Sequence, residues 1–211
     1  MKKLYIAIFA LAILSLIASA VLIPMMPETV PAHYNISGEA DRMGSRYETL
    51  IFPAITLLSS AFMAIVARKR RGTSEEKPLL IVGVATTALF MLIGIFFSVK
   101  ALTHVPAAPG NADVYRILLL VMGIFLVIAG NIMPKVRRNS VFGLRTPWSL
   151  KNDETWRKCQ RFGGISAVIC GLIMIATAIF TGGVTAMVIL IILIVMWSVL
   201  SIVMSYKYSK E

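Results

Sequence analysis

Apolar residues fill six long stretches of the 211-residue chain, and shorter polar segments separate them. Each stretch has about 20 residues, enough for an α-helix to cross the roughly 30 Å hydrocarbon layer of a membrane. Lipid offers the backbone no hydrogen-bond partner, so the spans must be helical. We therefore expect an all-α polytopic membrane protein, a bundle of six transmembrane helices. The predicted spans are residues 4–23, 50–67, 79–99, 115–133, 164–180 and 185–205.

The first stretch also imitates a secretory signal. Lys2 and Lys3 precede an apolar run that contains Ala18, Ser19 and Ala20, a pattern similar to a cleavage site. The apolar core of a signal peptide has about 7–15 residues, whereas this run continues for about 20. We therefore predict a retained transmembrane helix.

Composition supports the membrane class. Apolar residues make up 58% of the chain, charged residues 15%, and the mean hydropathy is +0.82. Soluble domains have about 45–50% apolar and about 25% charged residues, so an ordinary globular enzyme and a disordered chain are both excluded. Cys159 and Cys170 form neither a disulfide framework nor a metal-binding spacing.

The positions of the basic residues predict the orientation. With a cytoplasmic N-terminus, 17 Lys and Arg residues fall inside and 4 outside, which fits the positive-inside rule. Both termini should then be cytoplasmic. The net charge of +11 is explained by topology and by attraction to anionic headgroups of the lipid bilayer, so we expect no direct contact with nucleic acid. The inner segments are 1–3, 68–78, 134–163 and 206–211.

The outer loop at 24–49 is too long for a simple connector. Its three prolines favour extended backbone. Turn-forming residues predict two tight turns, at 35–38 and 41–44. We expect an ordered outer loop in which His33, Asn35, Gly38 and Asp41 form one compact unit.

Two interpretations of the outer-loop side chains stay open. His33, Glu39 and Asp41, joined by His104 from the next outer loop, are residue types that bind zinc or protons. Their spacing is not diagnostic, and the same groups commonly hydrogen-bond turns. We favour the turn interpretation and expect no metal and no cofactor.

The inner loop at 134–163 is the second long connector. Pro134 should end the fourth span, and Gly143 and Pro147 argue against one continuous helix. Asn152 is a predicted N-cap, with acidic residues in the first turn behind it. A helix starting there should run toward the fifth span, with a possible bend at 163–164.

That helix has an apolar stripe of Trp156, Cys159 and Phe162. The pattern predicts an inner interfacial amphipathic helix, with the tryptophan at headgroup depth. The basic residues on either side of the stripe are Arg157, Lys158 and Arg161.

Arg145 lies between Gly143 and Pro147 in apolar surroundings. An arginine in such a turn is either a structural anchor for a carboxylate or helix end, or a binding residue. In the fifth span, Gly163, Ala167 and Gly171 recur every four residues and permit close helix approach. We expect this stripe to pack within the bundle rather than at a homodimer seam.

Both long loops carry a family resemblance. Residues 31–41, Pro-Ala-His-Tyr-Asn-Ile-Ser-Gly-Glu-Ala-Asp, resemble the domain DUF1648. Residues 139–156, followed by basic residues and a glycine-bearing span, resemble the SdpI-type domain. The motif residues there are Asn139, Gly143, Arg145, Thr146, Pro147, Trp148 and Trp156. One departure is Gln160, where that family often has histidine.

The pairing of both domains on six spans is similar to the SdpI-type bacterial immunity protein family. The resemblance implies a plasma-membrane protein that protects a cell from a secreted toxic peptide. It also implies, for some members, a signalling receptor that sequesters a cytoplasmic repressor. It divides the chain into a DUF1648-like part at 1–67, a linker and third span at 68–114, and an SdpI-like part at 115–211.

Three function classes follow. A non-catalytic immunity or sensor protein fits best, because the chain has no nucleotide-binding loop and no nucleophile–base motif. A small transporter or ion pathway normally needs ionisable residues within the membrane, and the spans offer only hydroxyl groups and Asn131. A membrane enzyme would have to use the outer His33 and Asp41.

Overall fold

The computed structural model describes residues 1–35, 39–103, 113–139 and 141–211. Within these residues, six helices are long and apolar enough to cross a membrane. The protein is therefore a multi-pass membrane protein built on six transmembrane helices, as the hydropathy pattern predicts. The helices are α1 (Lys2–Leu22), α2 (Ile51–Lys69), α3 (Glu76–Leu102), α4 (Asp113–Ile132), α5 (Asp153–Phe180) and α6 (Gly183–Lys210).

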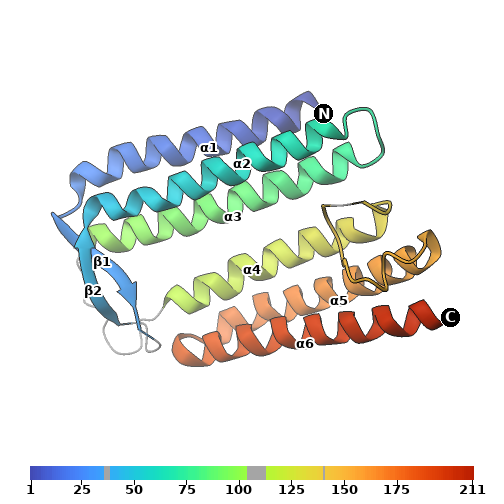
Figure 1. Ribbon diagram of the computed structural model, residues 1–211. Coiled ribbons are helices and arrows are strands. Elements are labelled where there is room, and N and C mark those ends of the chain that lie inside the picture. Colours follow the sequence, from blue (N-terminus) through green and yellow to red (C-terminus); the bar gives the residue numbers. More distant parts are fainter. Residues whose placement is uncertain (36–38, 104–112, 140) are drawn as a thin grey trace.

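The six helices run side by side in two groups of three (Figure 1). α1, α2 and α3 pack together, and α4, α5 and α6 form the second group. Both chain ends lie at one end of the bundle, here called the termini end. A β-hairpin covers the other, here called the hairpin end. α3, which the sequence places in a linker part, packs directly against α1 and α2.

In the first group, apolar side chains of the three helices meet at the termini end. Ile8, Ala67, Leu79 and Leu80 are each at most 1% exposed and form one cluster. Deeper in the bundle, Ser60 Oγ and Thr87 Oγ1 lie 3.2 Å apart. Both hydroxyls also donate to carbonyls of their own helices, so these polar groups are satisfied inside the apolar core.

In the second group, glycines bring α4 and α5 into backbone contact. A Cβ added to Gly123 would lie 2.8 Å from the carbonyl oxygen of Gly171. A Cβ added to Gly130 would lie 2.6 Å from the carbonyl oxygen of Gly164 and 2.9 Å from the Ala167 Cβ. The small-residue stripe therefore packs within the bundle at Ala167 and Gly171, opposite two glycines that the sequence analysis did not single out.

Gly163 has a different environment from the other two members of that stripe. It faces Met133 and Leu144, and its carbonyl oxygen accepts a hydrogen bond of 3.1 Å from Trp197 Nε1 of α6. An indole N–H needs a partner when it is buried in the membrane region, and this bond links α5 to α6.

The loop between α1 and α2 forms a two-stranded antiparallel hairpin, β1 (Thr29–Tyr34) and β2 (Ala40–Ser45). The expectation of an ordered loop with extended backbone is confirmed. The tight turn expected at 41–44 is wrong, because these residues pair with β1, as Val30 does with Gly44. In the described part of the chain, short 3₁₀ turns lie at Ile23–Met25, Arg46–Leu50 and Met133–Lys135.

The interfacial character expected for the helix that starts after Asn152 is not confirmed. α5 starts at Asp153, capped by the Asn152 side chain as predicted, and continues without interruption through 163–164 to Phe180. Trp156 and Cys159 are 1% and 0% exposed, so these two residues of the apolar stripe pack inside the protein, whereas Phe162 is half-buried. The cause is the preceding loop, which folds over the start of α5.

Candidate functional site

The hairpin carries a polar pair between its strands. His33 Nδ1 on β1 lies 2.6 Å from Asp41 Oδ1 on β2. Beside this pair, the Asn35 side chain accepts a hydrogen bond of 3.0 Å from Glu39 N and donates one of 3.3 Å to Glu39 Oε2. The structure thus brings together His33, Asn35 and Asp41, and Gly38 lies outside the described residues.

These donors do not make a metal centre in the described part of the chain. No group of three or more His, Cys, Asp or Glu side chains there is placed to hold a metal ion, and structural zinc usually takes four ligands. The side chains of His33 and Asp41 are 64% and 42% exposed. His104, the fourth member of the expected cluster, lies outside the described residues. The visible role of the pair is to join the two strands.

Several contacts hold the hairpin and the segments that flank it on the bundle. Arg46 Nη1 donates a hydrogen bond of 3.1 Å to the Met26 carbonyl oxygen. Tyr115 of α4 donates one of 2.9 Å from its hydroxyl to the Asn35 carbonyl oxygen. Val30 is 1% exposed and packs in an apolar cluster with the ends of α1 and α3. The hairpin therefore contacts both groups of helices.

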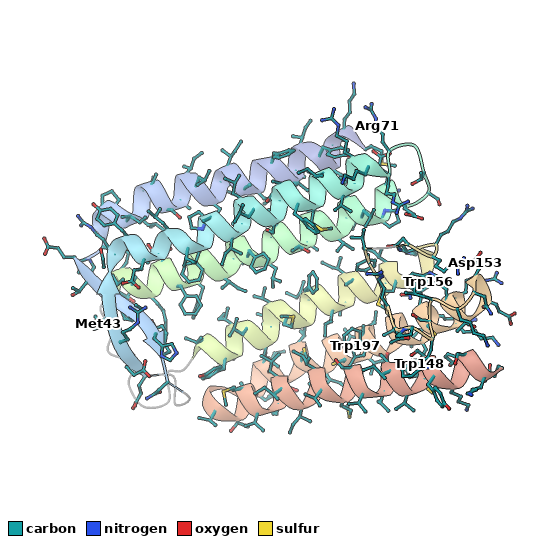
Figure 2. All side chains as sticks on the ribbon, viewed as in Figure 1. Met43, Arg71, Trp148, Asp153, Trp156 and Trp197 are labelled. Carbon is teal, nitrogen blue, oxygen red and sulfur yellow. The ribbon has the colours of Figure 1, made fainter. Side chains whose placement is uncertain are left out.

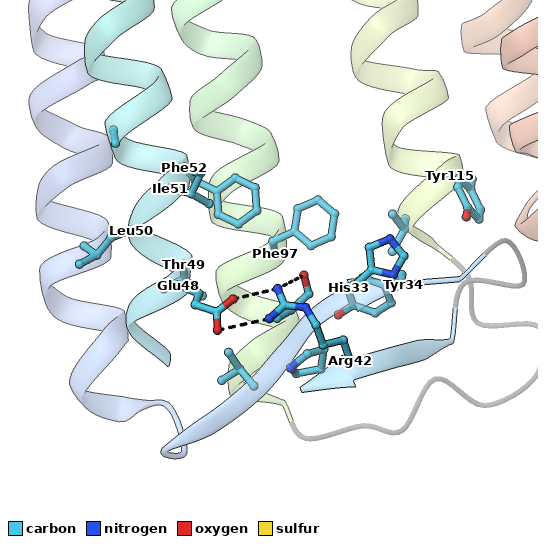
Figure 3. A pocket seen from close by; sticks show the side chains of 15 residues that line it. His33, Tyr34, Arg42, Glu48, Thr49, Leu50, Ile51, Phe52, Phe97 and Tyr115 are labelled. Atoms are coloured by element: carbon cyan, nitrogen blue, oxygen red, sulfur yellow. Dashed lines mark hydrogen bonds and ion pairs between the residues drawn. The ribbon is translucent and has the colours of Figure 1, made fainter. Parts of the chain in front are cut away.

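A cavity of about 760 Å³ lies under the hairpin, lined by β1, α2, α3 and α4 (Figure 3). Its walls are mainly apolar and include four aromatic rings. Phe52 and Phe97 stack with ring centroids 5.2 Å apart, and Tyr34 lies tilted against Phe97 at 5.8 Å. Tyr115 adds a fourth ring. Ligand pockets of about 300–1,000 Å³ with apolar walls bind small molecules and side chains, so this is the candidate binding site.

One ion pair stands at the rim of this cavity. Arg42 Nη2 lies 2.9 Å from Glu48 Oε2, and the same nitrogen donates a hydrogen bond of 3.4 Å to the Ala32 carbonyl oxygen (Figure 3). Glu48 Oε1 also accepts a hydrogen bond of 3.2 Å from Ser45 N. Sequence reasoning missed this pair because a six-residue separation across a strand end matches no regular periodicity.

The chemistry of the cavity suits binding. A tyrosine hydroxyl is protonated at neutral pH and can donate, and burial raises the pKa of Tyr34 further. The rim charges of Arg42 and Glu48 are matched, and the walls are apolar. Such a site favours an apolar or aromatic group with a polar edge at the rim.

At the termini end, the predicted motif loop is folded rather than open. The Asn139 side chain accepts from Val141 N and Phe142 N at 2.7 and 2.8 Å. It also donates to the carbonyl oxygens of Arg137 and Phe142. Gly143 follows with φ +112°, a conformation that glycine adopts without strain. Asn139 and Gly143 therefore shape this loop.

The loop is fixed to α5 and α6 at the termini end. Trp156 Nε1 donates a hydrogen bond of 2.8 Å to the Val136 carbonyl oxygen. Thr146 Oγ1 lies 2.8 Å from Ser205 Oγ of α6, and Trp148 packs edge-on against Tyr206. Figure 2 shows Trp148 and Trp156 at the same end as Arg71 and opposite Met43.

The loop also contacts the first helix group. Val141 and Phe142 pack against the cluster of α1–α3 side chains at the termini end, and Phe142 also reaches a second cluster that includes Met63 of α2 and Ile132 of α4. This segment therefore joins the two groups of three helices.

Several cations of the loop and of α5 remain free at the surface. Arg145 is exposed and makes no hydrogen bond or ion pair with a described residue. The anchor contact that the sequence allowed for it is therefore not observed. Arg157 and Arg161 are also exposed, whereas Lys158 lies 3.4 Å from Glu154 and 3.0 Å from Glu211. Pro147 is exposed beside Arg145.

These features define a class: a multi-pass membrane protein with a ligand-sized, aromatic cavity at one end and a folded, cationic loop at the other. Comparison with known proteins shows similarity to two families. Residues 135–205 match the SdpI/YfhL protein family, and residues 10–57 match a domain of unknown function, DUF1648. The last third of the chain is therefore similar to the SdpI/YfhL protein family, and its beginning is similar to DUF1648.

The similarity to one curated relative covers the whole chain. Over 211 residues the chain is 29% identical to the protein named Immunity protein SdpI from Bacillus subtilis strain 168, covering 100% of this chain and 98% of the relative. A stretch of 69 residues is 43% identical to an uncharacterized protein of Archaeoglobus fulgidus, covering 33% of this chain and 36% of that one. No solved structure matches significantly.

Proposed function

We propose that this protein is a non-catalytic immunity protein of the plasma membrane that protects its cell from a secreted toxic peptide. The observation that carries the proposal is the full-length similarity to Immunity protein SdpI. The aromatic cavity supports it, because this cavity is large enough to hold apolar side chains of a peptide.

The predicted orientation gives the cavity a role. If the termini are cytoplasmic, the hairpin end faces outward, and the cavity opens on the side from which a secreted peptide arrives. A membrane-active peptide presents apolar side chains. Phe52, Phe97 and Tyr34 offer matching surface, and burial of apolar area supplies the affinity.

We further propose a signalling role for the other end. Arg145, Arg157 and Arg161 form an exposed cationic surface without partners among the described residues. A cytoplasmic repressor with an acidic face would be attracted to it, and the attraction should weaken with salt. Val141 and Phe142 contact the first helix group, so this surface is physically linked to the helices under the hairpin.

The alternative functions gain less support. A transporter needs polar groups free to contact a passing ion, whereas the hydroxyls of Thr56, Ser60 and Thr87 are bonded to carbonyls of their own helices. An enzyme using His33 and Asp41 needs a nucleophile or metal beside them, and the cavity residues provide neither.

A cavity-filling variant tests the proposal. Cells sensitive to the culture supernatant of the source organism are made to express the wild type, Ala54→Phe or Ile55→Phe, and survival is normalised to protein level. Ala54 lines the cavity and its neighbour Ile55, 39% exposed, does not. Ala54→Phe should lose protection and Ile55→Phe should retain it. Equal survival of Ala54→Phe would reject the cavity as the site, and absence of protection by the wild type would reject immunity.

A further inference from the structure

A second cavity, of about 240 Å³, lies at the termini end between three helix ends. Lys2 and Tyr5 line it from the start of α1, Arg68 from the last turn of α2, and Arg71 and Glu76 from the turn before α3 and the start of α3. It is remote from the aromatic cavity, because Arg71 lies at the opposite end of the molecule from Met43 of the hairpin (Figure 2).

The charged side chains of this cavity have defined positions. Glu76 is only 4% exposed, and its Oε2 accepts a hydrogen bond of 2.9 Å from Gly72 N. This bond closes the turn that carries Arg71. Lys2, Arg68 and Arg71 then converge on the cavity with their side chains exposed. Three cations against one carboxylate leave an excess of positive charge in a concave site.

The positive-inside rule accounts for basic residues at this end of the bundle, but not for their convergence on a cavity. Lys69 and Lys77 belong to the same helix ends and do not line it. The concave site lies where helices leave the apolar layer, which is the depth of phospholipid headgroups. Guanidinium groups bind phosphate oxygens with two parallel hydrogen bonds.

We propose that this cavity binds the phosphate group of an anionic phospholipid. Arg68 and Arg71 donate to the phosphate oxygens, and Lys2 adds charge from α1. Glu76 holds the turn and limits the affinity for an anion. The bound headgroup would join the ends of α1, α2 and α3. This site is independent of the proposed immunity function.

The test uses the full chain purified in a neutral detergent. Phosphatidylglycerol or phosphatidylcholine is added, and native mass spectrometry measures the fraction of protein that retains a lipid. The wild type should retain phosphatidylglycerol in preference to phosphatidylcholine. The double variant Arg68→Gln/Arg71→Gln should lose this preference, with about a fivefold weaker retention for each cation removed. The matched control Lys69→Gln/Lys77→Gln, which removes the same charge from the same helix ends, should keep it.

Glu76→Gln provides a second measurement, since glutamine still accepts the Gly72 N–H and removes the negative charge. Its retention of phosphatidylglycerol should rise several-fold. A third arm adds inorganic phosphate as a competitor, which should displace little lipid because the acyl chains also bind.

Four results would overturn the proposal. They are equal retention of the two lipids, equal loss in the test and control double variants, weaker binding by Glu76→Gln, and displacement by inorganic phosphate at matched concentration. The last result would assign the site to a soluble phosphate.

Discussion

Gln160 holds the backbone of Leu144 by two hydrogen bonds of 2.9 Å. Its Oε1 accepts from Leu144 N, and its Nε2 donates to the Leu144 carbonyl oxygen. Gln160 is 1% exposed, and Gly143 lies so close that a Cβ there would overlap Gln160 Oε1. Gln160, which the sequence resemblance marks as a departure from a frequent histidine, is thus a buried contact between α5 and the motif loop.

Removing this contact should destabilise the loop. Gln160→Ala leaves the Leu144 N–H without a partner, whereas the carbonyl oxygen keeps only its hydrogen bond of 2.8 Å from Ser149 Oγ. We expect a loss of about 1–3 kcal/mol in the free energy of unfolding. Thermal unfolding in detergent measures it, with exposed Arg161→Ala as the control. An unchanged midpoint for Gln160→Ala would show that the loop satisfies Leu144 in another way.

The glycine contact between α4 and α5 should not accept a side chain. Gly171→Val places its Cβ against the Gly123 carbonyl oxygen, at 2.5 Å in the present backbone. Overpacking costs about 1–3 kcal/mol or more, so the unfolding midpoint should fall. Leu172→Val, at a position 54% exposed on the same helix, should have little effect. If Gly171→Val leaves the unfolding midpoint as little changed as Leu172→Val does, α4 and α5 can separate at no cost.

Cysteine labelling tests the orientation. Met43 of β2 and Lys210 at the end of α6 are both exposed, and both native cysteines are buried. In intact cells, a membrane-impermeant maleimide should label Met43→Cys and spare Lys210→Cys until the membrane is opened. Labelling of Lys210→Cys in intact cells would reverse the predicted topology.

The exposed cations should be needed for recruitment of a repressor and not for protection from the toxin. The triple variant Arg145→Gln/Arg157→Gln/Arg161→Gln should leave the unfolding midpoint unchanged. None of these three side chains makes a hydrogen bond or an ion pair with a described residue. The variant should reduce salt-sensitive recruitment of a tagged repressor encoded beside the gene, with toxin survival retained. Lys158→Gln is the control, since Lys158 is held by Glu154 and Glu211. Equal loss of survival and recruitment at normal abundance would contradict separability.

The His33–Asp41 pair should contribute little to stability. An exposed ion pair is worth about 0–1 kcal/mol, so we expect Asp41→Asn to change the free energy of unfolding by less than about 1 kcal/mol. Treatment with EDTA, followed by addition of zinc, should leave the unfolding midpoint of the wild type unchanged. A rise in the midpoint with zinc that Asp41→Asn abolishes would establish a metal site instead.

The sequence by itself determined the six spans, the N-cap at Asn152 and the ordered outer loop. These are local properties, because lipid forces each apolar stretch to satisfy its own backbone and an N-cap acts within one helical turn. The motif residues Asn139 and Gly143 were also recognisable, although their role as loop-shaping groups was not.

Only the tertiary structure decided which distant residues meet. The stripe of Trp156 and Cys159 predicts a lipid-facing surface, but hydropathy does not distinguish lipid from a protein interior of the same polarity. Likewise, Gly171 indicates close packing without naming Gly123 as its partner. The aromatic cavity needs Tyr34, Phe97 and Tyr115 from three separate segments. Such contacts depend on how the helices are placed relative to one another, and no local pattern contains that information.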